Sequence, residues 1–133
     1  INQRTIEEKK EWFHQFKNSE TSICLVGYEN DDLVGFVCST KFREKEAYNQ
    51  SLETSVYISE KFKGRGFGKK LMFELITRLK STNIKNLYAL ITYPNKTSIN
   101  LHKTLNFKKV GTLNNVGYKF KKYWSVHIYE LKL

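Results

Sequence analysis

"VYISEKFKGRGFGKK", residues Val56 to Lys70, holds three of the seven glycines in the chain. It overlaps a strictly alternating run, "ETSVYIS" (53–59), which predicts a half-buried strand. It leads into "KKLMFELITRLK" (69–80), whose apolar residues recur on one face of a helix. Because the free amides of a first helical turn point outward and the helix dipole favours negative charge there, this order predicts an anion site. Phosphate is the anion that such a site binds most naturally.

Two familiar phosphate-binding motifs do not fit these glycines. No GxxxxGK[ST] is present, and the pattern GxGxxG is absent because Gly64, Gly66 and Gly68 are spaced two apart. Glycine permits unusual backbone dihedrals and a close approach of a ligand to the backbone. The alternative interpretation is a glycine-rich turn that only reverses the direction of the chain.

The rest of the chain alternates between predicted strands and helices. The expected elements are a helix at 5–16, strands at 22–28 and 33–40, a charged loop at 41–51, a strand at 86–92, a short helix at 95–105, and long strands at 107–120 and 123–133. Elements alternate in the middle and strands pair at both ends, so the expected class is α/β, with a mixed, mostly antiparallel twisted sheet flanked by helices. With 133 residues and no linker, we expect residues 1–133 to form one domain.

Composition limits the cellular setting and the partners. No apolar run approaches the roughly 20 residues that would span a bilayer, so no membrane role is expected. Cys24 and Cys38 lie in apolar runs, which predicts buried free thiols and a cytoplasmic protein. The three histidines are scattered, so no metal site is expected. The net charge of +10 favours a polyanionic partner, and charge alone does not choose among nucleic acid, ribosomes, anionic lipid and a phosphate-rich cofactor.

The glycine stretch resembles a known signature. Lys63, Gly66 and Gly68 are similar to the Gln/Arg-x-x-Gly-x-Gly/Ala motif of the GCN5-related N-acetyltransferase (GNAT) superfamily. Within it the chain resembles the phosphinothricin and methionine sulfoximine N-acetyltransferases. The segments that carry this resemblance, in the family's order and spacing, are "TIEEKKEWF", "FREKEAY", "ETSVYIS", "KGRGFGKKL", "PNKTSINLHKTLNF" and "NNVGYKF".

The chain departs from the family pattern at three places. It opens at Ile1 without the family's first strand and helix, so we expect an N-terminally truncated sequence. The family's Leu-Gly-Phe is "LNF" here, where Asn106 can take the left-handed cap conformation. The family's Trp-x-Asp is replaced by Tyr123, Trp124 and Ser125, which bears on the substrate and the subunit contact.

The resemblance implies acetyl-CoA as co-substrate and no metal. The backbone of β-strand residues would pair with the pantetheine amides, and the amides after the strand would hold the pyrophosphate, with added attraction from Lys63, Arg65, Lys69 and Lys70. Asn95 would bond to the pantetheine or cap its own helix. The implied cofactor-binding residues are Val56, Tyr57, Ile58, Lys63, Gly64, Arg65, Gly66, Phe67, Gly68, Lys69 and Asn95.

Two residues are candidates for catalysis by direct transfer. Glu53 matches the family's base, because an amine with a pKa near ~10.4 must lose a proton before it can attack a thioester. The alternative is a surface glutamate that pairs with a lysine. His102 falls where this group has a histidine that could protonate the leaving thiolate or shuttle protons, and its alternative role is packing.

The acceptor pocket is implied by a further set of family positions. They are Trp12, Phe13, Phe42, Arg43 and Tyr48. Arg43 would suit a carboxylate or phosphinate, whereas Trp12 and Phe13 could equally be core residues of an amphipathic helix. The expected acceptor is a small amino-acid-like amine, and family analogy implies a homodimer. The alternatives are acetylation of a protein or ribosomal amine, or a non-catalytic module that binds CoA or nucleic acid; nucleic acid is not the expected partner.

Overall fold

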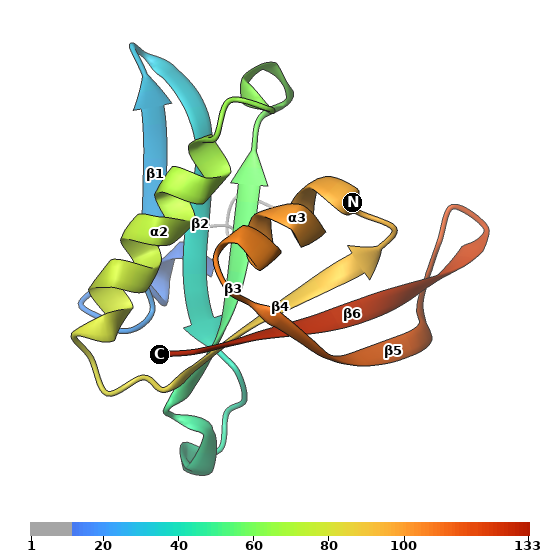
Figure 1. The fold of residues 1–133 in the computed structure, drawn as a ribbon. Helices are drawn as coiled ribbons and strands as arrows, with labels where there is room; N and C mark the ends of the chain where they lie inside the picture. The colour runs from blue at the N-terminus through green and yellow to red at the C-terminus, as the bar shows by residue number, and fades with distance from the viewer. Residues whose placement is uncertain (1–11) are drawn as a thin grey trace.

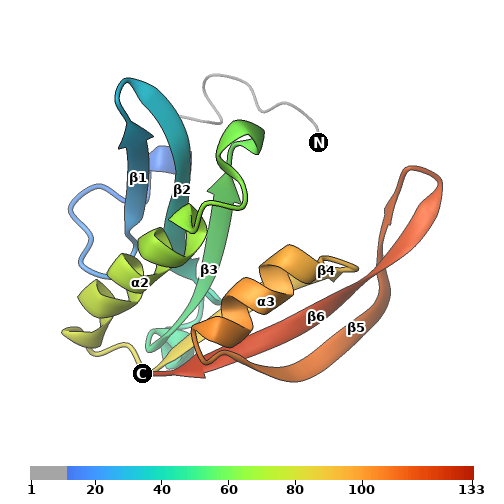
Figure 2. The same cartoon turned by 45° about the horizontal axis from the view of Figure 1, so that its top comes forward.

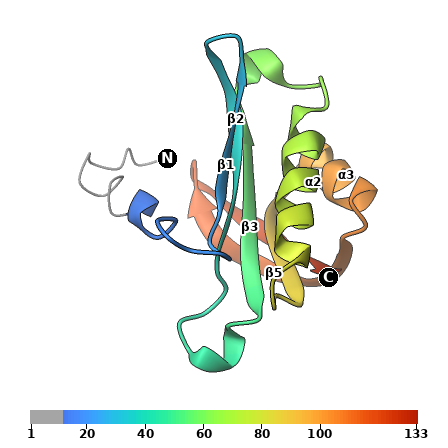
Figure 3. The same cartoon turned by 90° about the vertical axis from the view of Figure 1, so that its left-hand side faces the viewer.

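The computed structural model describes residues 12–133. One sheet of six strands has the order β1-β2-β3-β4-β6-β5, and two helices cover one of its faces (Figures 1 and 3). The elements in chain order are β1 (Cys24–Glu29), β2 (Asp32–Lys41), η1 (Glu46–Tyr48), β3 (Ser51–Ile58), η2 (Glu60–Phe62), α2 (Phe67–Lys80), β4 (Asn86–Tyr93), α3 (Lys96–Thr104), β5 (Lys108–Lys119) and β6 (Lys122–Lys132).

The sheet is antiparallel everywhere except between β3 and β4. These two strands pair in parallel only from Ser51 with Asn86 to Glu53 with Tyr88. Beyond that point they separate, as Figure 2 shows, and β4 pairs with β6 along its whole length instead. The β4-facing edge of residues 54–58 therefore has no strand partner in the described part of the chain.

The core lies between α2 and the sheet. Met72, Leu75, Ile76 and Leu79 form the buried face of α2, as the apolar spacing predicts. Their partners in the core cluster include Val37, Leu52 and Leu87 from three strands. Each fully buried side chain of this kind stabilises the fold by about 1.5–3 kcal/mol relative to exposure. This packing fixes α2 against β1, β2 and β3.

The sequence predicts this architecture, and the strand and helix boundaries differ from expectation by two residues or fewer. One of the shifts of two residues is at α2, which begins at Phe67 because Gly66, with φ of 81°, takes a left-handed N-cap conformation. Asn106 has φ of 69°, which confirms its left-handed conformation. Of the predicted N-terminal helix, Trp12 to His14 are helical and the chain has left the helix by Phe16; residues 5–11 lie outside the described part.

The expected burial of both thiols is only half correct. Cys38 is buried, but Cys24 is partly exposed because it lies on the edge strand β1. Both are free thiols, and burial raises the pKa of Cys38 to about 11. Among residues 12–133, no helix is long and apolar enough to cross a bilayer.

Candidate functional site

The turn between β3 and α2 exposes unpaired amides. Gly64 and Gly66 have φ of 77° and 81°, and a side chain at either would meet nothing within 4 Å. Gly66 is the N-cap of α2 without a side-chain cap, and the first helical bond runs from the Lys70 amide to the Gly66 carbonyl, 3.2 Å away. Phe67, Gly68 and Lys69 lie between Gly66 and Lys70. Within residues 12–133, the amides of these three residues have no hydrogen-bond acceptor. The turn thus offers a set of donors at the positive end of a helix of 14 residues.

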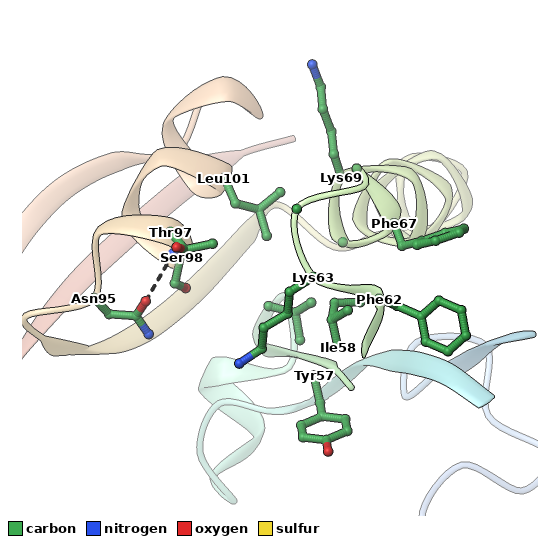
Figure 4. A pocket seen from close by; sticks show the side chains of 14 residues that line it. Tyr57, Ile58, Phe62, Lys63, Phe67, Lys69, Asn95, Thr97, Ser98 and Leu101 are labelled. Carbon is green, nitrogen blue, oxygen red and sulfur yellow. Dashed lines mark hydrogen bonds between the residues drawn. The ribbon is translucent and has the colours of Figure 1, made fainter. Parts of the chain in front are cut away.

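A cavity of about 410 Å³ opens beside this turn. In Figure 4, α3 forms one wall, and β3 with the glycine turn forms the other. The residues that line it are Val56, Tyr57, Ile58, Phe62, Lys63, Gly64, Gly66, Phe67, Gly68, Lys69, Asn95, Thr97, Ser98 and Leu101. Every residue assigned to the cofactor from sequence is among them except Arg65. The chain's own groups therefore fit a ligand that combines a diphosphate with an extended amide-bearing arm.

Sequence reasoning missed four of these lining residues. They are Phe62, Thr97, Ser98 and Leu101. Asn95, Ser98 and Leu101 are spaced three apart, so the helical spacing after the cap was the available signal. The Asn95 side chain accepts a hydrogen bond from the Ser98 amide at 3.2 Å, so the expected N-cap is present (Figure 4). The same residue also lines the cavity.

A second cavity of about 310 Å³ brings the two candidate catalytic residues together. Glu53 and His102 both line it, and it shares Val56, Asn95 and Ser98 with the first cavity. Glu53 is the last residue of β3 that pairs with β4, so it stands where the strands part. It is partly buried. Glu53 thus lines this second cavity at the point where β3 and β4 separate.

His102 is held as a neutral ring. It is only 2% exposed, and its Nδ1 lies 2.7 Å from the Ser98 carbonyl oxygen. A carbonyl can only accept, so Nδ1 carries the proton and Nε2 is the acceptor. Burial lowers the pKa of His102, and the edge of the ring packs against Phe107 with centroids 5.0 Å apart. The neutral ring therefore offers Nε2 as a hydrogen-bond acceptor, and the lowered pKa disfavours its protonation.

The residues assigned to the acceptor fall into two aromatic groups. In the first, Trp12 contacts Phe13 with ring centroids 4.8 Å apart and Phe36 at 6.2 Å. Phe36 stacks on Tyr57 of the cofactor cleft at 5.6 Å. The first group is therefore linked to the cofactor cleft through Phe36.

The second group lies at the other end of β3. The Phe42 ring contacts Tyr48 at 6.2 Å and Tyr88 at 4.9 Å, and the Arg43 guanidinium lies 4.3 Å over Phe42. Arg43 donates to the Phe42 carbonyl at 2.7 Å and makes no ion pair within the described residues. Tyr88 was not predicted from the sequence, because the residue pattern of its strand does not show that it contacts Phe42.

Tyr88 is itself anchored from the next strand. Its hydroxyl donates to the Glu130 carboxylate at 2.8 Å. Burial, together with this hydrogen bond, raises the pKa of Tyr88, so it stays a protonated donor. Glu53 and Glu130 both pair with Tyr88 in register, so the three side chains lie in a row on one face of the sheet. Among the residues described, no three His, Cys, Asp or Glu side chains gather to hold a metal ion.

Comparisons with known proteins identify relatives in sequence and in fold. A model of the acetyltransferase (GNAT) family matches residues 2–107. The chain is 35% identical over 131 residues to a phosphinothricin N-acetyltransferase of Streptomyces coelicolor, covering 97% of this chain and 77% of that protein. The crystal structure of an N-acetyltransferase from Staphylococcus aureus matches with a TM-score of 0.92 at 36% identity, covering 97% of this chain and 78% of the other. A Salmonella typhimurium structure with its cofactor acetyl-CoA matches with a TM-score of 0.90 at 27% identity, covering 99% and 77%.

Proposed function

The chain belongs to the GNAT family of acetyltransferases, and from this premise we propose that it transfers acetyl from acetyl-CoA to the free amine of a small amino-acid-like substrate. The observation that carries this proposal is that the two cavities adjoin and share the lining residues Val56, Asn95 and Ser98. The free amides of the glycine turn line one, Glu53 lines the other, and Val56 belongs to both. One ligand can thus reach from the anion site to the carboxylate.

In this proposal the chain binds the cofactor mainly through its backbone. The unpartnered edge of β3 at 56–58 hydrogen-bonds the pantetheine as an added strand would. The amides from Gly64 to Lys69 bind the pyrophosphate, and Lys63 and Lys69 add electrostatic attraction. The side-chain oxygen of Asn95 accepts the cap bond, so its NH2 group is free to donate to the cofactor.

The chain's residues then remove one proton from the attacking amine and transfer one near the leaving sulfur. Acetyl-CoA supplies a thioester that a neutral amine can attack directly. Glu53 accepts the proton of the ammonium group, directly or through a water, and the amides of β3 polarise the acetyl carbonyl. His102, with an unprotonated Nε2, passes a proton on near the leaving sulfur. Because its pKa is lowered, the ring does not stay protonated. Neither Cys24 nor Cys38 lines either cavity, so no covalent enzyme intermediate is invoked.

Arg43 is the proposed partner of the acceptor's carboxylate or phosphinate. Its guanidinium is fixed over Phe42 yet has no anionic partner in the part of the chain that the structure describes. A planar guanidinium binds a carboxylate through two parallel hydrogen bonds. Tyr48, whose ring contacts Phe42, supplies apolar surface beside it, and Trp12 lines a cavity together with Tyr48. Phe13 adds to this surface through its contact with Trp12.

We further propose that two copies of the chain associate and that the reaction is cytoplasmic. The edge strand β5 exposes several large apolar side chains, among them Val110, Val116 and Tyr118, a surface that isolated soluble proteins usually cover. The two free thiols suit a reducing compartment. Light scattering on the purified protein would give twice the chain mass if this association forms.

A turnover screen tests the proposed function. Release of the CoA thiol is followed with phosphinothricin, methionine sulfoximine, the common amino acids, polyamines and basic peptides, each in parallel. We expect release with amines that carry an adjacent carboxylate and none with polyamines. Release with basic peptides alone would replace the proposal with acetylation of a protein amine, and no release with any amine would reject it.

A further inference from the structure

Arg65, in the middle of the glycine turn, is bound to a distant part of the chain. Its two terminal nitrogens donate to the two carboxylate oxygens of Glu29, at 2.9 and 2.8 Å. The guanidinium also lies 5.6 Å from the ring centre of Phe62 and 5.1 Å from that of Phe67. A bidentate pair of this kind fixes direction as well as distance. Arg65 is therefore held on the hairpin side of the turn and does not line the cofactor cavity.

The turn needs such a tether because of the residues around Arg65. Gly64 and Gly66 flank it, and both have positive φ. Glycine loses more conformational freedom on folding than any other residue, so an untethered turn with two glycines would sample many shapes. Neither glycine has a side chain that could fix one of these shapes, and Gly66 has no side-chain cap within residues 12–133.

Glu29 comes from the β1–β2 hairpin. It is the last residue of β1, and it pairs in register with Asp32 of β2 across the hairpin turn. Asp32 in turn accepts a hydrogen bond from Lys61 at 2.8 Å, just before the turn. The β1–β2 hairpin thus holds the chain on both sides of Gly64, through two ion pairs.

We propose that Glu29 is a positioning residue for cofactor binding: by holding Arg65 through a bidentate ion pair, it keeps the glycine turn in the shape whose amides face the cavity. This inference rests on the proposed function in so far as acetyl-CoA is the ligand of those amides. Glu29 does not touch the cofactor in this assignment. The pKa of its carboxyl is lowered by the hydrogen bond to Arg65, so the pair stays ionised across the neutral range.

The same geometry has an opposite interpretation that experiment can separate. Glu29 could instead compete with a phosphate for Arg65, in which case Arg65 would swing to the cofactor. A positioning carboxylate helps binding, and its removal weakens it. A competing carboxylate hinders binding, and its removal strengthens it. The sign of the change after Glu29→Gln therefore decides between them.

The experiment measures acetyl-CoA binding by calorimetry for the wild type, Glu29→Gln, Arg65→Glu and the exchanged pair Glu29→Arg with Arg65→Glu. We expect Glu29→Gln to weaken binding about 3- to 5-fold. We expect Arg65→Glu to weaken it more, and the exchanged pair to recover most of that loss, because the ion pair is rebuilt with its charges reversed. In steady state, the KM for acetyl-CoA should rise in Glu29→Gln, with kcat and the acceptor KM unchanged.

A matched control and a second measurement complete the test. Glu74→Gln removes the Arg78–Glu74 ion pair of α2, which is also exposed to solvent, and should leave binding unchanged. In the ligand-free protein, ¹⁵N order parameters of the Gly64 and Gly66 amides should fall in Glu29→Gln and not in Glu74→Gln.

Tighter or unchanged binding in Glu29→Gln, or no recovery in the exchanged pair, would overturn the positioning role. A wild type that binds no acetyl-CoA would instead overturn the proposed function. In that case the order parameters alone would still show whether Glu29 orders the turn.

Discussion

The two halves of the candidate site are built in different ways. The cofactor cleft consists mostly of backbone groups from one continuous stretch, 56–69, held between β3 and α2. The acceptor face consists of side chains: Arg43 and Phe42 come from the loop after β2, Tyr88 from β4, and Glu130 from β6. A phosphate can be bound by any chain that takes the right dihedrals, whereas a particular amine needs particular side chains.

This difference teaches where the protein's selectivity should reside. Changes on the cofactor side should alter the affinity for acetyl-CoA without altering the choice of amine. Changes on the acceptor side should do the reverse. Glu53 lies where β3 and β4 part and belongs to both sides. A substitution of Glu53 should therefore alter only the rate of the chemical step.

The largest effect is expected at this shared point. Glu53→Gln keeps the shape and removes the base, so kcat should fall about 100-fold or more, while the dissociation constant for acetyl-CoA stays the same. Glu46→Gln, in the exposed η1, serves as the control and should leave kcat unchanged. If Glu53→Gln retains full activity at every pH, Glu53 is not the base that deprotonates the amine.

A change in the turn should break the cofactor side alone. Gly66→Ala places a side chain where φ is 81°, a left-handed conformation that costs other residues about 1–2 kcal/mol. If the turn relaxes to avoid this cost, acetyl-CoA binding should weaken by up to about 30-fold, as measured by calorimetry.

The control for this change is Gly117→Ala in β5. A methyl group there meets no atom closer than 3.9 Å, so binding should stay unchanged. Equal weakening in both variants would show that the loss comes from general destabilisation and not from the turn.

A change at Arg43 should affect the acceptor side alone. Arg43→Gln removes the charge that is proposed to bind the carboxylate, so the KM for the acceptor should rise about 10-fold while that for acetyl-CoA stays the same. Lys45→Gln, in the same loop, is the control. A decarboxylated amine should lose nothing on going from wild type to Arg43→Gln; if it loses as much as the amino acid, the guanidinium has another role.

The smallest effect is expected at His102, which lies on the cofactor side of the boundary. Burial lowers its pKa in the folded state, so the unfolded chain binds a proton first as pH falls. Stability from this residue is therefore complete above about pH 6.5 and is lost as pH falls below it. Thermal unfolding between pH 7 and pH 5 should show a shallower decline for His102→Gln than for the wild type. An identical decline would mean that the ring is already protonated or exposed.

The elements around the proposed cofactor cleft were predictable from sequence because their signals are local. The alternation of 53–59 gives the strand, the spacing of Gly64, Gly66 and Gly68 gives the turn, and Asn95 gives the start of α3. Helical spacing indicates that the missed residues Ser98 and Leu101 share a face with Asn95, but only the fold places that face, and Thr97, opposite β3.

The acceptor side was less predictable because its contacts join residues far apart in the chain. Tyr88 meets Glu130 through the pairing of β4 with β6, and it meets Phe42 because β3 pairs with both β4 and β2. Arg65, on the cofactor side, shows the same limit: its place in the glycine turn predicts a cofactor contact, and its ion pair with Glu29 joins residues far apart in the chain. Register decides which side chains meet, and register is a property of the folded sheet.

The most direct test of the central claim compares two ligands that differ by the diphosphate. Calorimetric titration with CoA and with pantetheine, which lacks the nucleotide and its phosphates, isolates what the amides at the start of α2 contribute. Because charge-assisted hydrogen bonds contribute about 1.5–3 kcal/mol each, we expect CoA to bind about 100-fold or more tightly than pantetheine, with one site per chain. Equal affinities, or no heat with CoA on folded protein, would contradict the assignment of the glycine turn as the diphosphate site.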